Sequence, residues 1–141
     1  MSANVLIVDD SATMRRVIRR TLTISGLDIG EAYEASNGIQ ALAQMAEHEI
    51  AALILDINMP LMNGLQLIKR MHADPRLAHV PVVVASTEGS DARIQELLAA
   101  GVLGFVRKPF QPEQLRDVLQ PILGLRAEPA GAEQTGIGDA F

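Results

Sequence analysis

The segment Val5-Leu6-Ile7-Val8-Asp9-Asp10 sets the pattern that decides the fold. Its four apolar residues are rich in β-branched side chains and end at two aspartates, which is typical of a short strand buried on both faces. Apolar runs of the same kind recur at residues 51–55, 81–85 and 103–106, and a weaker alternating stretch covers residues 28–35. The sequence therefore predicts five short strands.

Segments with helical spacing follow these strands. They begin near Ser11, Ile39, Gly64, Ser90 and Pro112. Apolar residues recur in them every three or four positions, as in helices that cover a core on one side. Strands that alternate with helices over short connections predict an α/β fold, with a parallel sheet covered on both faces.

The composition changes after Gly124. Residues 125–141 hold one basic and three acidic residues, together with three Gly residues, one Pro and no helical period. We therefore expect a folded domain over residues 1–124 and a disordered acidic tail over residues 125–141. This tail is interpreted as a solvated chain end, and the alternative is a docking peptide formed by Ile137 to Phe141.

Charge and composition exclude several classes of protein. Twelve basic against seventeen acidic residues give a formal net charge of −5, which argues against the basic footprint of nucleic-acid binding. Cysteine is absent, so disulfides, zinc thiolates and thiol nucleophiles are excluded. The longest apolar run, residues 50–55, is far shorter than the ~20 residues of a membrane-spanning helix. We expect a cytoplasmic monomer that binds neither nucleic acid nor membrane.

Six polar residues follow the predicted strands directly. They are Asp9, Asp10, Asp56, Ser86, Thr87 and Lys108. Because ligands of an open parallel sheet collect beyond the carboxyl ends of its strands, these side chains are expected to converge on one crevice. Two carboxylates about 4 Å apart repel by roughly 4 kcal/mol at an effective dielectric constant of about 20, so three in one pocket favour a bound cation. Oxygen donors suit Mg²⁺, and a lysine beside them suits a phosphoryl group.

Each of these residues also has a purely structural interpretation. Asp9 and Asp10 are typical helix caps, Asp56 is then a loop acid, and Lys108 a solvated surface lysine. Their occurrence together, at strand ends and in order along the chain, favours the metal and phosphate site.

With these residues in place, the chain resembles the receiver domain of bacterial two-component response regulators. The resemblance covers about residues 4–124 and is greatest toward the stand-alone chemotaxis regulators of the CheY type. It is carried by Asp9-Asp10, by the segment Asp56-Ile-Asn-Met-Pro-Leu-Met-Asn-Gly64, by Ser86-Thr87 and by Lys108-Pro109-Phe110. It implies a single flavodoxin-like (βα)5 receiver domain with strand order 2-1-3-4-5, and no output domain after it.

The resemblance implies a phosphoacceptor and a metal site. Asp56 would attack a phosphohistidine on a sensor histidine kinase, or a small donor such as acetyl phosphate. Asp10, Asp56 and the backbone carbonyl of Asn58 would hold Mg²⁺, and Asp9 would act mainly through water.

The resemblance also implies the residues that contact and sense the phosphoryl group. Lys108 would contact the phosphoryl oxygens, and its bond to Pro109 would be cis. Ser86 and Thr87 would complete the catalytic set, with Ser86 as the switch hydroxyl. Phe105 would be the coupled aromatic that turns inward, although a Phe at a strand end is also a common core residue.

Two positions would tune hydrolysis of the phosphoaspartate. Asn58 and Glu88 match the pair found in chemotaxis regulators, which implies a short-lived signal. Thr87 departs from the alanine that chemotaxis members often carry, and its bulk would slow attack by water or by small donors.

The function implied is that of a single-domain response regulator in a two-component phosphorelay, not an enzyme that acts on other substrates. Its output protein would bind the face between Ser90 and Leu123. A phosphorelay intermediate, which passes the phosphoryl group to another protein, is an alternative that the sequence does not separate. An aspartyl-phosphate phosphatase is less favoured, because Asn58 stands where such enzymes place an acid–base aspartate.

The first predicted helix carries a basic stripe. Arg15, Arg16, Arg19 and Arg20 form two pairs four residues apart. In response regulators this helix lies beside the kinase-docking surface, so the stripe is either a contact for an acidic partner or a solvated helix face. The sequence supports both interpretations equally.

Overall fold

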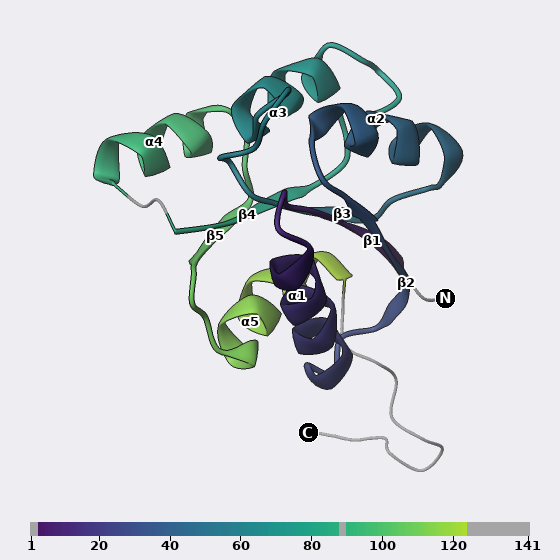
Figure 1. The fold of residues 1–141 in the computed structure, drawn as a ribbon, viewed down its shortest axis with the longest axis vertical. Helices are drawn as coiled ribbons and strands as arrows, with labels where there is room; N and C mark the ends of the chain where they lie inside the picture. The colour runs from purple at the N-terminus through teal and green to yellow at the C-terminus, as the bar shows by residue number, and fades with distance from the viewer. Residues whose placement is uncertain (1–2, 88–89, 124–141) are drawn as a thin grey trace.

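The structure is a computed structural model that describes residues 3–87 and 90–123. Five described strands alternate with five described helices, as the sequence predicts (Figure 1). In chain order they are β1 (Ala3–Val8), α1 (Ala12–Ile24), β2 (Ile29–Ala35), α2 (Gly38–Glu47), β3 (Ala52–Leu55), α3 (Gly64–His72), β4 (Val82–Ser86), α4 (Asp91–Ala99), β5 (Gly104–Arg107) and α5 (Pro112–Leu123). The predicted tail and Glu88 lie outside the described residues.

The five strands form one parallel sheet of order β2-β1-β3-β4-β5, which confirms the predicted topology. Val8 at the end of β1 pairs with Ala35 of β2 on one side and with Leu55 of β3 on the other. Leu55 in turn pairs with Val84 of β4. The register therefore brings the carboxyl ends of β1, β3 and β4 to the same edge of the sheet. The strand order changes direction at β1, because β2 lies on one side of it and β3 on the other.

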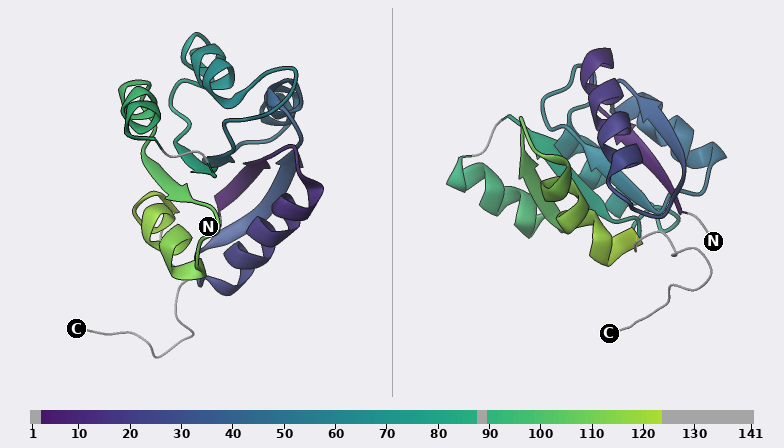
Figure 2. Two further views of the ribbon diagram at one scale, coloured as in Figure 1. Left: turned by 60° about the vertical axis from the view of Figure 1, so that its left-hand side comes forward. Right: turned by 90° about the horizontal axis from the view of Figure 1, so that it is seen from below.

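Helices cover both faces of this sheet (Figures 1 and 2). Helices α1 and α5 lie on one face, and α2, α3 and α4 lie on the other. Because successive side chains of a strand point to opposite faces, β1 contributes Val5 and Ile7 to the core with α1 and α5, and Leu6 and Val8 to the core with α2, α3 and α4. All four of these side chains have no exposed surface, which explains the unbroken apolar run in the sequence.

Short polar residues start four of the helices. The side chains of Ser11, Asn37, Asn63 and Ser90 each accept a hydrogen bond from a backbone N–H in the first turn. This satisfies a donor that the helix itself leaves unpaired. The caps of α1, α2 and α4 follow within four residues of a strand end, so these helices begin close to the carboxyl edge of the sheet.

The described helices include none that is both long enough and apolar enough to cross a membrane.

The two-layer core predicts that truncating two helical leucines changes the free energy of unfolding by very different amounts. Leu115 of α5 is fully buried, whereas Leu98 of α4 is about half exposed. We expect Leu115→Ala to lower the free energy of unfolding by about 2–5 kcal/mol, because it leaves a cavity under the sheet. The matched substitution Leu98→Ala should change it by about 0.5 kcal/mol or less. Urea denaturation of both variants checks this, and equal losses would contradict the assignment of α5 to the core.

Candidate functional site

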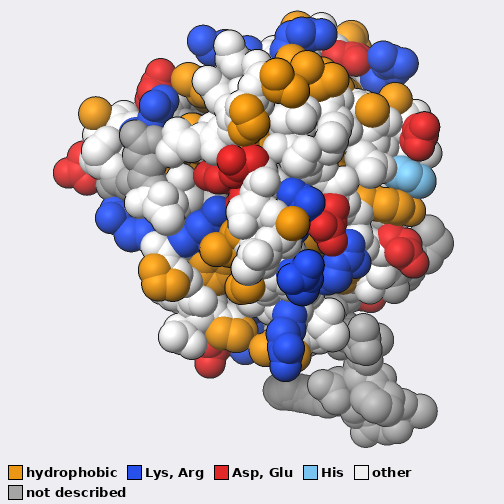
Figure 3. All heavy atoms as spheres, viewed as in Figure 1, with side chains coloured by type: hydrophobic (Ala, Val, Ile, Leu, Met, Phe, Trp, Pro, Cys, Tyr) orange, Lys and Arg blue, Asp and Glu red, His pale blue; other side chains and the backbone are white. Residues whose placement is uncertain are grey.

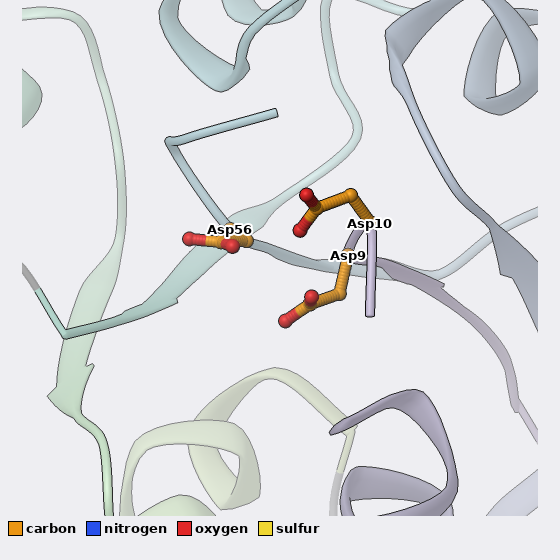
Figure 4. A group of neighbouring side chains, drawn as sticks. All are labelled: Asp9, Asp10 and Asp56. Carbon is orange, nitrogen blue, oxygen red and sulfur yellow. The ribbon is translucent and has the colours of Figure 1, made fainter. Parts of the chain in front are cut away.

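Three aspartates gather at the carboxyl edge of the sheet. Asp9 and Asp10 follow β1, and Asp56 follows β3 (Figure 4). One carboxylate oxygen from each lies within 4.8 Å of the others. The structure therefore brings together, from two neighbouring strands, three of the residues that the sequence singled out.

Asp9 is the most constrained of the three. It is almost completely buried, with 1% of its surface exposed. One carboxylate oxygen accepts a hydrogen bond from the backbone N–H of Ser11 at 2.9 Å, and the other accepts one from the ammonium of Lys108 at 2.5 Å. The Asp9 backbone N–H donates to the carbonyl of Ala35 in β2. Both the main chain and the side chain of Asp9 are thus fixed by neighbouring elements.

Lys108 enters the site from the end of β5. Its side chain is 7% exposed, and its Nζ lies 3.7 Å from Asp56 Oδ2 in addition to its contact with Asp9. The backbone N–H of Lys108 donates to the carbonyl of Ser86 at 3.0 Å, which ties the lysine to the end of β4. The Lys108–Pro109 peptide bond is cis, as the resemblance implied. The interpretation of Lys108 as a solvated surface lysine is therefore wrong.

Asp56 has an electrostatic environment that disfavours its charge. Its side chain is 11% exposed. Burial raises the pKa of the Asp56 carboxyl, and the nearby charge of Asp9 raises it further. The positive charge of Lys108 and the backbone N–H groups of Asn58 and Ile57 oppose this rise but do not cancel it. The carboxylate is thus held in a place where an additional positive charge would stabilise it.

Two glycines let neighbouring helices approach the loop after Asp56 closely. A Cβ at Gly64 would lie 2.8 Å from the carbonyl oxygen of Asp56 and from the Cα of Ile57, so only a glycine lets α3 start this close to the loop. The Gly64 N–H donates to the carbonyl of Ile57. On the other side, Gly38 at the start of α2 donates to the carbonyl of Met62 and packs against its side chain. The sequence places Gly64 at the start of a helix and in the segment after Asp56, but no local pattern predicts this contact.

Among the other predicted site residues that the structure describes, three lie at or just beyond the carboxyl ends of β3 and β4, namely Asn58, Ser86 and Thr87. Ser86 is the last residue of β4, rather than the first residue after it, and is fully buried. Thr87 follows it and is exposed, as is Asn58, whose backbone N–H approaches Asp56 Oδ1 at 3.4 Å. Phe105 in β5 is partly buried and packs against the core on the side of α2, α3 and α4.

The basic stripe of α1 is divided in two by the tertiary structure. Figure 3 shows basic side chains over this helix. Arg15 and Arg19 turn toward β2 and form ion pairs with Glu34 at 2.8 and 2.7 Å. Arg16 and Arg20 are exposed. The sequence alone did not single out Glu34, because nothing local marks one glutamate of β2 as the partner of two arginines on a helix.

Glu34 is stabilised in its charged form. Burial alone would raise the pKa of its carboxyl, but hydrogen bonds from Arg19 and Arg15, together with their positive charges, lower the pKa below its usual value. Its contribution to stability is therefore present at neutral pH and is lost as the pH falls through the acidic range.

The donor set at the edge fits a hard divalent cation. All three acidic side chains offer carboxylate oxygens, which Mg²⁺ prefers. Asp10 is exposed, so water has access to the group. Three negative charges face the single ammonium of Lys108, which leaves the cluster with an excess of negative charge.

The family model of the response regulator receiver domain matches residues 5–120. The chain belongs to the response regulator receiver family. This receiver domain is 40% identical over 129 residues to a chemotaxis protein CheY homolog of Campylobacter jejuni, a match that covers 91% of the chain and 98% of that protein. It is 42% identical over 120 residues to chemotaxis protein CheY1 of Helicobacter pylori, covering 84% of the chain and 95% of that protein.

Solved structures agree with this assignment. The crystallised chemotaxis protein CheY4 of Vibrio cholerae superposes with a TM-score of 0.78 at 35% identity, over 87% of this chain and 100% of that one. The receiver domain is thus homologous to the CheY chemotaxis regulators of two-component systems, and the flavodoxin-like fold expected from the sequence is confirmed.

The raised pKa of Asp56 predicts that removing its charge stabilises the metal-free domain. In the folded state the carboxyl binds its proton more tightly than in the unfolded chain. The ionised form therefore costs stability, a cost that appears as the pH rises above about 3.8 and is complete above the folded-state pKa. We expect Asp56→Asn to be more stable than the native chain at pH 7 in EDTA, with a gain that shrinks toward pH 4. Urea denaturation across this range measures it.

Asp74→Asn is the control of opposite sign. A hydrogen bond from Arg76 lowers the pKa of Asp74, so its ionised form stabilises the fold and its loss should slightly reduce stability at pH 7. A destabilising Asp56→Asn in EDTA at pH 7 would contradict the electrostatic account of the site.

The contact at Gly64 predicts that the site tolerates no side chain there. Gly64→Ala forces the start of α3 away from the Asp56–Ile57 backbone, because two of the three nearest atoms, the carbonyl oxygen of Asp56 and the Cα of Ile57, belong to the main chain and cannot swing aside. We expect a loss of about 1–3 kcal/mol in the free energy of unfolding. Thermal and urea denaturation check this. An unchanged stability would show that the loop yields without cost.

Proposed function

We propose that this chain is a single-domain response regulator that accepts a phosphoryl group on Asp56 with the help of Mg²⁺. The observation that carries the proposal is the position of Asp56, largely buried, within a three-carboxylate group and 3.7 Å from the ammonium of Lys108. The homology to chemotaxis regulators supports a pathway of the chemotaxis type.

We assign the metal to Asp10, Asp56 and the backbone carbonyl of Asn58, with Asp9 acting through water. The hydrogen bonds of Asp9 support this division, since both of its carboxylate oxygens already accept N–H donors. Mg²⁺ in this position would neutralise charge on the oxygens of the phosphoryl group during transfer. The exposed Asp10 leaves room for the waters that Mg²⁺ usually keeps.

The proposed transfer needs few groups. A carboxylate oxygen of Asp56 forms a bond to phosphorus while the P–N bond of a kinase phosphohistidine breaks, and the imidazole leaves with the bonding electrons. With acetyl phosphate, the P–O bond breaks and acetate leaves. Lys108 is held beside Asp56 by Asp9 and contacts the oxygens of the arriving group. In the same way water attacks the phosphoaspartate later, with Asn58 and Glu88 tuning the rate.

The phosphoryl group adds about 1.5 to 2 negative charges and several hydrogen-bond acceptors to the edge of the sheet. We assign its detection to the switch residues Ser86, at the end of β4, and Phe105, and we place Thr87 with Ser86 in the catalytic set. The backbone bond between Lys108 and Ser86 supports this assignment, because it couples the phosphate-binding lysine to the switch residue. The domain would catalyse only its own phosphorylation and dephosphorylation.

The signal would be read by an output protein on the face between Ser90 and Leu123, formed by α4, β5 and α5. Leu98 and Leu103 expose apolar surface there, 48% and 61% of each residue, which an output protein would cover on binding. A sensor histidine kinase is the proposed donor, and the cytoplasm the proposed location. A phosphorelay role, in which Asp56 passes its phosphoryl group to a histidine on another protein, is the second candidate.

The test is intact-mass analysis after incubation with acetyl phosphate, with and without Mg²⁺. We expect one phosphoryl group per chain that requires both Mg²⁺ and Asp56 and that decays with time. Asp56→Asn should give no adduct. The matched control Asp117→Asn removes an exposed aspartate outside the site and should behave as the native chain does.

Other outcomes identify the alternatives. An adduct in Asp56→Asn would contradict the acceptor assignment. No adduct in the native chain, but one in Thr87→Ala, would mean that Thr87 blocks small donors and that only a kinase delivers the group. Onward transfer to a histidine protein would favour the phosphorelay role, and repeated turnover of a phosphomonoester would favour a phosphatase instead of a switch.

A further inference from the structure

Arg15 connects the acidic cluster to the neighbouring strand. Its Nη1 donates to the backbone carbonyl of Asp9 at 2.7 Å, and its Nε donates to Glu34 Oε1 at 2.8 Å. The side chain is 17% exposed, so it lies under the surface rather than in the solvent. One guanidinium thus contacts both the β1–α1 turn and β2.

The carbonyl that Arg15 contacts belongs to the peptide unit between Asp9 and Asp10. A change in the ψ angle of Asp9 would move this carbonyl and turn the Cα–Cβ bond of Asp10 with it, which would redirect the Asp10 carboxylate relative to Asp56. Within the part of the chain that the structure describes, no hydrogen bond or ion pair is found for the Asp10 side chain, which is exposed. The direction of Asp10 is therefore set by its backbone, and Arg15 holds that backbone.

Glu34 in turn holds Arg15. Its Oε1 accepts from Arg15 and its Oε2 accepts from Nε and Nη2 of Arg19. Glu34 precedes Ala35, whose carbonyl accepts the N–H of Asp9. The β1–α1 turn is consequently fixed to the end of β2 twice, once by this backbone bond and once through Arg15 and Glu34.

We propose that Arg15 is a positioning residue for Mg²⁺ binding, which it supports by fixing the Asp9–Asp10 peptide, and that Glu34 orients its guanidinium for this purpose. The proposal rests on the magnesium site proposed above. Arg15 donates to Asp9's backbone carbonyl, not to its carboxylate oxygens, so no metal ligand is lost when Arg15 is replaced.

A simple electrostatic effect predicts the opposite sign. Arg15 is a positive charge near a cation site, so its removal would strengthen Mg²⁺ binding if charge alone mattered. Loss of the positioning contact weakens binding instead, because Asp10 then has to be ordered when the cation arrives. The direction of the change therefore separates the two explanations.

The experiment is isothermal titration of Mg²⁺ into the native chain and into Arg15→Gln, Arg15→Lys and Arg19→Gln. We expect Arg15→Gln to bind Mg²⁺ about tenfold more weakly, as is typical when a residue that supports a metal ligand is lost. Arg15→Lys keeps the charge but lacks the planar fork that spans both partners, so it should also bind more weakly. Arg19→Gln is the matched control, since Arg19 pairs with Glu34 and with the carbonyl of Ala32 but has no contact with Asp9.

A second readout separates positioning from general loss of structure. The rate of phosphorylation by acetyl phosphate should need more Mg²⁺ in Arg15→Gln and approach the native rate at saturating Mg²⁺, while urea denaturation in EDTA shows a similar loss of stability for Arg15→Gln and Arg19→Gln. If Arg15→Gln does not fold, Arg15→Lys and Glu34→Gln carry the test, and both should weaken binding.

Equal or tighter Mg²⁺ binding by the folded Arg15 variants would overturn the inference. Equal weakening by Arg19→Gln would also overturn it, since the effect would then follow the ion pair with Glu34 and not the contact with Asp9. A native chain that binds no Mg²⁺ would instead refute the proposed function, so the two failures are distinguishable.

Discussion

The buried ion pair between Asp9 and Lys108 is the interaction on which the rest of the site depends. Both side chains are removed from water, Asp9 almost completely, and each would be costly to bury without the other. Removing one partner of such a pair typically costs about 3–5 kcal/mol, because the remaining charge is left uncompensated. The pair joins residues 99 positions apart in the chain, and it can form only when β1 and β5 end at the same edge of the sheet.

The side chains at this edge of the sheet carry a net negative charge. One ammonium faces three carboxylates, and the pKa of Asp56 is raised in consequence of its burial and of the charge of Asp9. A bound cation would stabilise the ionised form of Asp56 in a site of this kind, and Lys108 could contact an anionic group there. The backbone hydrogen bonds of Asp9, Ser86 and Gly64 hold these groups in place at the edge of the sheet.

The strands, the helices and the polar residues at the strand ends could be predicted because each has a local signature. The apolar run of β1 is buried on both faces, and polar residues at strand ends converge in any parallel sheet. The pairing of Arg15 and Arg19 with Glu34 could not be predicted, since spacing along α1 treats all four arginines alike. The need for glycine at position 64 was also hidden, because its cause is a backbone segment from another element.

The sequence by itself determined the class of fold, the order of the elements and the identity of the acidic group, because burial patterns and residue types are properties of short segments. Only the tertiary structure decided that Lys108 is buried against Asp9, that Ser86 closes β4 rather than following it, and that half of the basic stripe turns inward. These facts depend on which strand lies beside which and on the distances between their ends. Such distances arise from packing between distant segments, and no local pattern records them.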